Sequence, residues 1–388
     1  MDPVSPLAHW ALDPAILHLN HGSYGGCLRR VLDDAAAFRA RMEAAPMTFF
    51  VAEWQPALDR ARTAFARFVR APDSRLAFLP SATTGTAIAL ASAALGPGDE
   101  VLVTSQTYRA VANQLARTGA HPVVVAVPLP FDPDELVDRV RRAITPRTRL
   151  ALLDHVTSGT ACIFPIERLL PLFAGIPVLV DGAHAAGQID LDVGALFALG
   201  ATWYAGNCHK WLCAPKSAGF LATAEHATAR PVITSHGASP EYGPANRYHA
   251  ELDWPGTHDP SPYLAVPSAI EHVGAAGGGW DALRARNHAL ALRLRDRLAD
   301  AMGATPAPLA PDDSFGAMVT VPISLPAPAA QIQLQLLARG CEVPVIDLPG
   351  CPLVRLSAHL YTGEADADAL ATHLRAVGVG VLSRHGRA

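Results

Sequence analysis

The sequence predicts an α/β protein in which a large domain, built on a mostly parallel wound sheet, precedes a smaller α+β domain. Three observations support this class. The 388 residues are half hydrophobic and only 17% charged, which is enough apolar surface for a large core and a smaller companion. Short apolar segments alternate with helix-period segments from about residue 55 to 225. After residue 225 this alternation ends, and a looser pattern follows.

The first domain is expected to contain short strands that are apolar along their whole length. Such strands are typical of a parallel sheet whose two faces are both covered by helices. The strands are predicted at residues 75–79, 100–104, 122–127, 149–156, 176–181, 202–206 and 218–223. Helices are predicted between them, at residues 56–70, 83–95, 109–119, 132–144 and 166–174.

A long segment rich in Gly, Pro and polar residues, 236–263, separates the two patterns and shows no clear period. Loops of this length are uncommon in compact domains unless they are functional, so we expect this one to shape the site. Beyond it the sequence predicts a long amphipathic helix, then alternating strands and helices. These elements are expected at residues 280–302, 317–323, 329–340 and 353–360, with a closing helix from about residue 364.

Composition argues against several classes of protein. The formal charge is −4 and no Lys/Arg cluster is interleaved with aromatic residues, so we expect neither a nucleic-acid nor a membrane partner. No apolar run approaches the ~18–20 residues of a membrane span, and the first residues do not resemble a signal peptide, which predicts a cytoplasmic protein. Six cysteines lack CxxC or metal-ligand spacing, so we expect neither a disulfide framework nor a metal site.

The segment GNCHKWLCAPKSAGF, residues 206–220, contains both lysines of the chain, Lys210 and Lys216. Basic positions elsewhere are arginines, a bias typical of a high-GC coding background, so the retention of two lysines is the informative observation. Arginine replaces lysine on a surface but does not deprotonate in proteins, and therefore cannot form an imine. We predict that one of these lysines is a Schiff-base nucleophile.

Three further features accompany the lysines. Thr83 and Thr84 open a helix after a strand, where free backbone N–H groups bind phosphate, although small polar residues there are also ordinary caps. Asp181 directly follows an apolar strand, at the edge where α/β sheets bind ligands. Arg355 lies within an apolar strand, where a buried guanidinium needs an anionic partner. Together, in this order, these features predict pyridoxal phosphate bound for work on an amino acid.

Over nearly the whole chain the motifs LNHGSYGG, ATTGT, DHVTSGT, DGAHAAGQ, NCHKWLCAPKSAGFL, WPGTHDP and VRLSAHLY resemble the isopenicillin N epimerase-like branch of the class V aminotransferase-fold enzymes. The resemblance implies a fold-type I homodimer with its active site at the subunit interface. It implies an N-terminal arm at residues 1–20 that packs on the small domain, a large domain at 21–260 and a small domain at 261–388. It also implies that Lys210 forms the Schiff base and that Lys216 is an accessory residue.

The resemblance further assigns cofactor contacts. Asp181 would pair with the pyridine nitrogen, His184 would bond the phenolic oxygen and Tyr108 would stack on the ring. The phosphate would be held by Thr83, Thr84, Asn207 and His209, joined by Gly256 and Thr257 from the second subunit. Thr157 and Ser158 would line the cofactor.

The substrate contacts follow in the same way from the resemblance. Arg355 would bind the α-carboxylate, and Asn20, His21 and Gly22 would line the pocket. His258 stands where the family more often has an arginine, so the local substrate contact is expected to differ.

The reaction is less constrained by sequence than the cofactor. Lys210 is the expected proton carrier on one face of the substrate Cα. Epimerisation needs a second acid or base on the other face, for which Tyr108 is the candidate, whereas β-elimination needs none. The relatives implied by the resemblance include C–S lyases and enzymes of lincosamide-type pathways. On their account we predict a lyase step on a cysteine S-conjugate, by β-elimination or decarboxylation-coupled deamination, in specialised metabolism. Epimerisation ranks second.

Two other functions stay open at this point. Cys341 lies upstream of Arg355, near the place where cysteine desulfurases of this superfamily keep their persulfide-forming cysteine. However, no histidine neighbours Cys341 and the adjacent Glu342 would raise the thiol pKa, so a buried structural cysteine is the favoured interpretation. A cofactor-free binding protein that has kept the fold is the last alternative.

Overall fold

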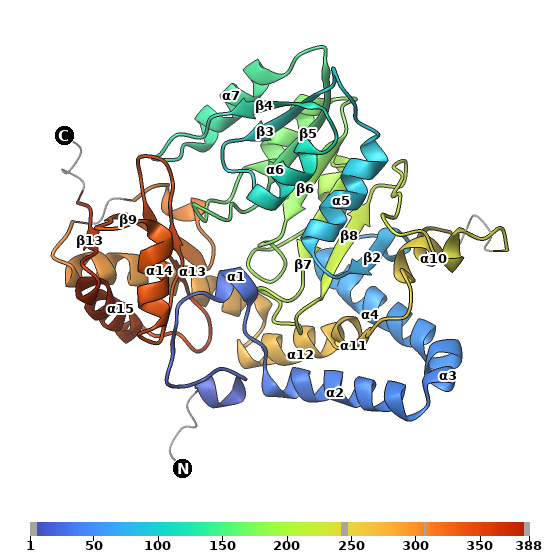
Figure 1. Ribbon diagram of the computed structural model, residues 1–388, viewed down its shortest axis with the longest axis horizontal. Coiled ribbons are helices and arrows are strands. Elements are labelled where there is room, and N and C mark those ends of the chain that lie inside the picture. The colour runs from blue at the N-terminus through green and yellow to red at the C-terminus, as the bar shows by residue number, and fades with distance from the viewer. Residues whose placement is uncertain (1–5, 242–246, 306–307, 384–388) are drawn as a thin grey trace.

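The computed structural model describes residues 6–241, 247–305 and 308–383. Its large domain is built on a seven-stranded sheet in the order β2-β8-β7-β6-β5-β3-β4 (Figure 1). Every strand predicted for this domain is present. The strands are β2 Leu76–Leu79, β3 Glu100–Thr104, β4 His121–Val125, β5 Thr148–Asp154, β6 Val178–Gly182, β7 Trp203–Asn207 and β8 Gly219–Thr223.

The sheet is mixed, because β8 runs antiparallel to both of its neighbours while β3 to β7 run parallel to one another. Parallel strands need a crossover, usually a helix, but β8 follows β7 through a short loop and so must reverse direction. That loop, residues 208–218, contains both lysines and is called the lysine loop below.

Helices cover the large sheet on both faces and form the base of the domain (Figure 1). Ser81 caps α5, with its Oγ accepting from the Thr84 amide at 3.3 Å. Residues 166–174, expected as one helix, form α8 and then a 3-10 turn over Leu170–Phe173, because Pro171 offers no backbone donor. The helices here are α2 Arg29–Ala44, α3 Pro46–Thr48, α4 Trp54–Val69, α5 Ala82–Ala93, α6 Arg109–Ala116, α7 Pro133–Ala143, α8 Ile166–Leu169 and α9 Val193–Ala198.

The long segment around residues 236–263 contains more regular structure than its sequence suggests, since a short helix, α10 Arg247–Asp253, forms within it. It leads into α11 Ser261–Leu264 and α12 Val266–Ala276, which pack against α2 and α4 below the large sheet (Figure 1).

The small domain is an antiparallel sheet in the order β11-β12-β9-β13, packed against helices (Figure 1). Its elements agree with the predicted ones, and two short strands, β11 and β13, complete the sheet. The elements are α13 Trp280–Ala301, β9 Met318–Ser324, α14 Ala329–Leu337, β11 Val345–Ile346, β12 Leu353–Ser357, α15 Ala365–Ala376 and β13 Gly380–Val381.

The N-terminal arm joins the two domains. Its short strand β1 Leu17–His18 pairs in parallel with β10 Cys341–Glu342 of the small domain. The chain then forms α1 His21–Tyr24, which lies between the small domain and the large sheet (Figure 1). Across the described residues, no helix combines the length and apolar character that crossing a bilayer requires.

Candidate active site

A pocket opens at the carboxyl edge of the large sheet, where β5, β6 and β7 end side by side. Wound α/β sheets bind their ligands at this edge. The arm, the first turn of α5, the strand ends and the lysine loop all contribute to its wall. Half of the predicted site residues line this one pocket, namely Thr83, Tyr108, Ser158, Asp181, His184, Asn207, His209 and Lys210.

Lys210 begins a turn of the lysine loop and directs its amine into the pocket, 3.1 Å from Nε2 of His184. Burial lowers the pKa of this amine to about 7, helped by the charge of Arg355 and opposed by that of Asp181. An amine with such a pKa is largely uncharged just above neutral pH, so it can act as a nucleophile or as a base. Burial also lowers the pKa of His184 far below its ordinary value, so its ring is neutral.

Asp181 ends β6 with its side chain buried, and its Oδ1 accepts from the Ala183 amide at 2.9 Å. Burial raises the pKa of Asp181, while that hydrogen bond and the charge of Lys210 lower it. A carboxylate at this position, facing a lysine, is suited to hold a protonated ring nitrogen. The pairing of Asp181 with the ring nitrogen stays a prediction.

Asp154 is a pocket residue that the sequence analysis did not single out. It ends β5 in register with Asp181 on β6 and lines the same pocket. Burial and the neighbouring charge of Asp181 raise its pKa well above the ordinary value, and among the described residues its Oδ2 has no hydrogen-bond partner. We infer that the pair carries one negative charge, on Asp181, with Asp154 protonated. The sequence contains a signal for Asp154, because the motifs DHV and DGA each place an aspartate at the end of a predicted strand.

The phosphate end of the pocket is formed by the start of α5. Asn207 accepts from the Ala82 amide at 2.8 Å and so ties β7 to the first turn of that helix. His209 donates through Nδ1 to the Ala218 carbonyl at 3.0 Å, which leaves Nε2 available. Burial lowers the His209 pKa to about 4, and a bound phosphate would raise it by adding a negative charge nearby. Thr84 lines a neighbouring apolar pocket instead.

These residues fit pyridoxal phosphate. The cofactor needs an amine for its aldehyde, a carboxylate for its pyridine nitrogen and backbone donors for its phosphate, and the pocket offers Lys210, Asp181 and the start of α5. In the part of the chain that is described, Nδ1 of the buried His184 has no partner.

The end of β6 depends on a glycine for its packing. A Cβ at Gly182 would lie 2.2 Å from the Tyr204 ring.

Arg355 enters the site from the small domain on β12. Its guanidinium donates to the Ser158 carbonyl, to Ser23 Oγ at 2.9 Å and to Asn20 Oδ1 at 3.4 Å. Burial lowers its pKa to about 10, which leaves it charged at neutral pH. Its hydrogen-bond partners among the described residues are all neutral oxygens, and its Nε has none. A buried charge in such surroundings is suited to bind a carboxylate.

Other predicted residues lie outside the pocket. The Thr157 hydroxyl bonds Thr160 Oγ1 at 2.7 Å within its own turn. His21 points toward the lysine-loop backbone, and a Cβ at Gly22 would lie 2.4 Å from Met318 Sδ, so Gly22 serves close packing. Gly256 and Thr257 lie between α10 and α11 and are not among the lining residues, and their role in a second subunit stays a prediction.

Cys341 is unsuited to the persulfide role. It is fully buried in β10, with an exposed fraction of 0%, and pairs with the arm rather than facing the pocket. Burial, assisted by Glu342, raises its pKa to about 12. Because the thiolate is the reactive form, this cysteine is inert at neutral pH.

Comparisons with known proteins show the family and the fold of this chain. The model of the DegT/DnrJ/EryC1/StrS aminotransferase family matches residues 50–346. An isopenicillin N epimerase of Amycolatopsis lactamdurans is 36% identical over 94% of this chain and 96% of its own. A putative L-cysteine desulfhydrase of Oryza sativa subsp. japonica is 33% identical over 75% of this chain and 64% of its own. The solved complex of the cystine C-S lyase C-DES with cysteine persulfide has a TM-score of 0.79 at 20% identity, covering 94% of this chain and 98% of that one, and confirms the predicted fold.

Proposed function

We propose that this chain is a β-eliminating lyase that releases a thiol from a cysteine S-conjugate. The chain belongs to the DegT/DnrJ/EryC1/StrS aminotransferase family and is a homologue of isopenicillin N epimerases. It is a pyridoxal-phosphate-dependent enzyme, so a cofactor-free binding protein is no longer an alternative. The substrate class and the reaction are the parts proposed.

Substrate binding is assigned to Arg355. The α-carboxylate would be bound by Nε, which has no partner among the described residues, together with a terminal nitrogen that now donates to Ser23 or Ser158. Bidentate capture fixes the orientation of the Cα–H bond as well as contributing affinity. Pyridoxal phosphate, when bound, holds the substrate nitrogen and accepts the electron pair released at Cα. Asp181 keeps the ring nitrogen protonated and so favours that electron flow.

Lys210 would remove the Cα proton. Its lowered pKa lets the amine accept a proton near neutral pH, and His184, 3.1 Å away, orients it. The Cβ–S bond then breaks with its electron pair on sulfur, and the proton held by Lys210 is available to the departing thiolate. The remaining dehydroamino acid hydrolyses to a keto acid and ammonia.

One observation carries the choice of elimination. The pocket holds a single amine base with a pKa near neutral, whereas its other titratable groups with shifted pKa values are a neutral histidine pair and a carboxylate pair. Elimination needs one base and a leaving group at Cβ. Epimerisation also requires a group that returns a proton to the opposite face of Cα.

Epimerisation is the second candidate because a specific observation favours it. Two isopenicillin N epimerases, 36% and 34% identical to this chain, each cover 94% of it. Tyr108 lines the pocket from the start of α6, with 48% of its surface exposed, and is the phenol we propose as the second acid. We also propose a homodimer in which Gly256 and Thr257 of one copy complete the phosphate site of the other.

Product analysis in D2O separates the two reactions. The cofactor-loaded enzyme is incubated with S-alkyl and S-aryl L-cysteine conjugates and, separately, with amino acids that lack a leaving group. A released thiol and pyruvate support the lyase, whereas intact substrate that has gained deuterium at Cα and lost optical purity supports the epimerase. Carbon dioxide with an aldehyde would point to decarboxylating deamination. Lys210→Ala serves as the control for uncatalysed loss of thiol.

A further inference from the structure

The turn formed by residues 20–26, called the arm turn below, lies directly on the backbone of the lysine loop. Gly25 has a φ of +72°, and a Cβ there would lie 2.0 Å from the His209 carbonyl oxygen. Any larger residue would therefore push the two backbones apart. The arm turn is thus in main-chain contact with the residue that precedes Lys210.

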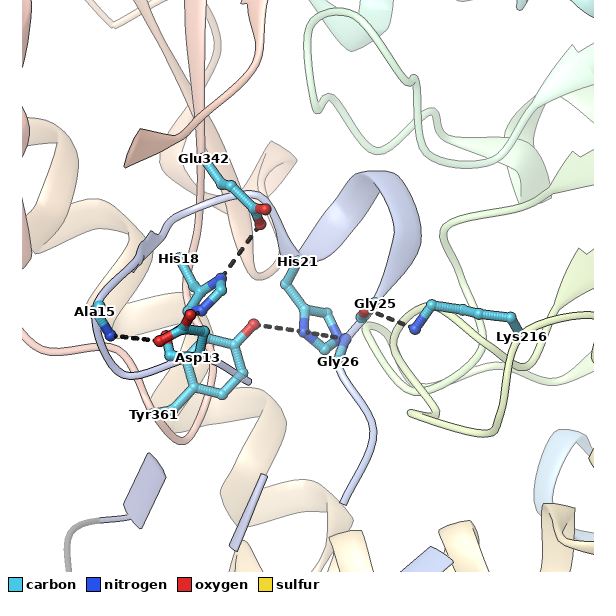
Figure 2. A network of polar contacts seen from close by, with 9 residues as sticks. All are labelled: Asp13, Ala15, His18, His21, Gly25, Gly26, Lys216, Glu342 and Tyr361. Atoms are coloured by element: carbon cyan, nitrogen blue, oxygen red, sulfur yellow. Dashed lines mark hydrogen bonds and ion pairs between the residues drawn. The ribbon is translucent and has the colours of Figure 1, made fainter. Parts of the chain in front are cut away.

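His21 makes the first side-chain link between the arm turn and the lysine loop. Its Nε2 lies 3.1 Å from the Lys210 carbonyl oxygen. The Gly26 amide and the Tyr361 hydroxyl lie 3.2 Å and 2.8 Å from its Nδ1 (Figure 2). A carbonyl only accepts and an amide only donates, so Nε2 carries the hydrogen and Nδ1 accepts. Burial lowers the His21 pKa to about 3, which keeps the ring in this neutral tautomer.

Lys216 makes the second link, from the far end of the same loop. Its ammonium donates to the Gly25 carbonyl at 2.9 Å (Figure 2). The two links together hold the loop at both ends. Lys216 is exposed, and its charge is not among the causes of the Lys210 pKa shift. An effect of Lys216 on Lys210 would therefore pass through position rather than through charge.

The arm turn also contacts the small domain. The Gly22 amide donates to Ser357 Oγ at 3.1 Å, and Ser23 Oγ accepts from Arg355 at 2.9 Å. One short turn therefore touches both the arginine assigned to the substrate carboxylate and the backbone that carries the catalytic amine.

A metal site is the other interpretation of this cluster, because donor atoms of His21, Cys213 and His359 lie within 4.8 Å of one another. The geometry does not support it. Nε2 of His21 already donates its hydrogen to the Lys210 carbonyl. The rings of His21 and His359 are also stacked, with centroids 4.1 Å apart and planes 18° apart, so their in-plane lone pairs run side by side and do not converge on one ion.

We propose that His21 and Lys216 are positioning residues that hold the Lys210 backbone so that its amine stays in the pocket beside His184. The inference rests on the proposed function only in taking Lys210 as the reactive amine. Burial is the largest cause of the lowered Lys210 pKa. A loop released from the arm turn would admit water to the amine, and its pKa would return toward the ordinary value.

The test titrates Lys210 in the cofactor-free protein. Reductive methylation is measured against pH, and peptide fragmentation locates the label, which is simple because the chain has two lysines. For Lys216→Met and His21→Phe we expect the midpoint at Lys210 to rise by about one pH unit or more, since burial no longer opposes the charge. Lys216→Arg and His21→Gln keep a donor at each link and should restore most of the wild-type midpoint.

His18→Gln is the matched control. His18 belongs to the same arm and bonds Glu342 and the Asp13 carbonyl, without touching the lysine loop (Figure 2). Its loss should leave the Lys210 midpoint unchanged. Thermal melts verify that each variant is folded, and Lys216→Met, at an exposed position, keeps the test usable if His21→Phe unfolds.

An unchanged midpoint in folded Lys216→Met and His21→Phe would overturn the proposal, and so would an equal rise in His18→Gln. The titration requires neither substrate nor turnover. A failure to release thiol in the product assay would therefore count against the proposed lyase and leave this result intact.

Discussion

The two ends of the lysine loop contrast sharply although both carry a lysine. At one end, Lys210 is partly buried and lines the pocket with His184 and Asp181, and its pKa falls to about 7. At the other end, Lys216 is exposed and donates to a backbone carbonyl of the arm. The same side chain is thus a reactive amine in one setting and a tether in the other. The difference shows that the surroundings of a lysine determine its chemistry, whereas its residue type only permits that chemistry.

Substitution of each lysine should produce the largest contrast. Lys210→Ala removes the base and the cofactor attachment point, so we expect activity to fall by at least ~10³-fold and the visible absorption of the bound cofactor to change. Lys216→Ala should keep the cofactor and lose far less activity than Lys210→Ala, with its activity displaced toward higher pH. Steady-state kinetics and absorption spectra measure both effects. A visible spectrum lost in Lys216→Ala and kept in Lys210→Ala would reverse the assignment.

Substitutions of the two buried aspartates, Asp181 and Asp154, should also have unequal effects on activity. Asp181→Asn removes the charge that faces the ring nitrogen, and we expect kcat/KM to fall ~10²-fold, in line with the loss of a hydrogen bond to a charged group. Asp154→Asn replaces a protonated acid with an amide of similar size and should stay within about tenfold of wild type. Equal losses in the two variants would mean that the negative charge is shared.

Substitution of Arg355 tests whether the small domain binds the substrate carboxylate. Arg355→Lys keeps the charge but loses the planar fork, so we expect KM for the amino acid to rise ~10-fold to 100-fold with a smaller change in kcat. An amine analogue that lacks the carboxylate provides the control, because its weak binding should be unaffected. If the amine loses affinity equally, Arg355 supports the fold rather than the substrate.

A fourth experiment concerns pH and stability. The native Lys210 pKa lies below its unfolded value, so between pH about 7 and about 10.4 the unfolded chain holds a proton that the native chain lacks. The free energy of unfolding of the cofactor-free protein should therefore rise with pH across this window. Lys210→Met should flatten this rise and add about 1–3 kcal/mol near pH 7, as measured by urea denaturation. In a Lys216→Met variant the free energy of unfolding should rise with pH as steeply as in the wild type or less steeply. A steeper rise would contradict this expectation.

The smallest effect on activity is expected at Cys341. Cys341→Ala removes a buried sulfur and should lower the free energy of unfolding by about 1 kcal/mol, while kcat/KM stays unchanged. Chemical denaturation and the thiol-release assay measure the two quantities. Loss of activity in the folded variant would restore the desulfurase alternative.

Prediction from sequence succeeded where the signal is local. The apolar runs of the large sheet became strands β2 to β8, and the helix periods between them became α4 to α8. The prediction was wrong in detail at residues 166–174, where Pro171 divides the helix, and α10 was missed within the Gly- and Pro-rich segment because its seven residues are too few to show a clear period.

The site was predictable in its membership and less so in its geometry. Lys210, Asp181 and Arg355 were identified by their chemistry at strand ends and in an apolar strand. Asp154 was missed, because its proximity to Asp181 depends on the pairing of β5 with β6. The direction in which His21 points depends on contacts with Lys210 and Tyr361, which are remote in sequence.

The sequence by itself determined the class of fold, the strand and helix order and the one pair of lysines able to carry imine chemistry, because periodicity and side-chain chemistry are properties of short segments. Only the tertiary structure decided which groups share a pocket, which lysine is buried, and that Cys341 is inert. Those properties arise from burial and from charges brought together by distant segments, as when Arg355 of the small domain lowers the pKa of Lys210 in the large one.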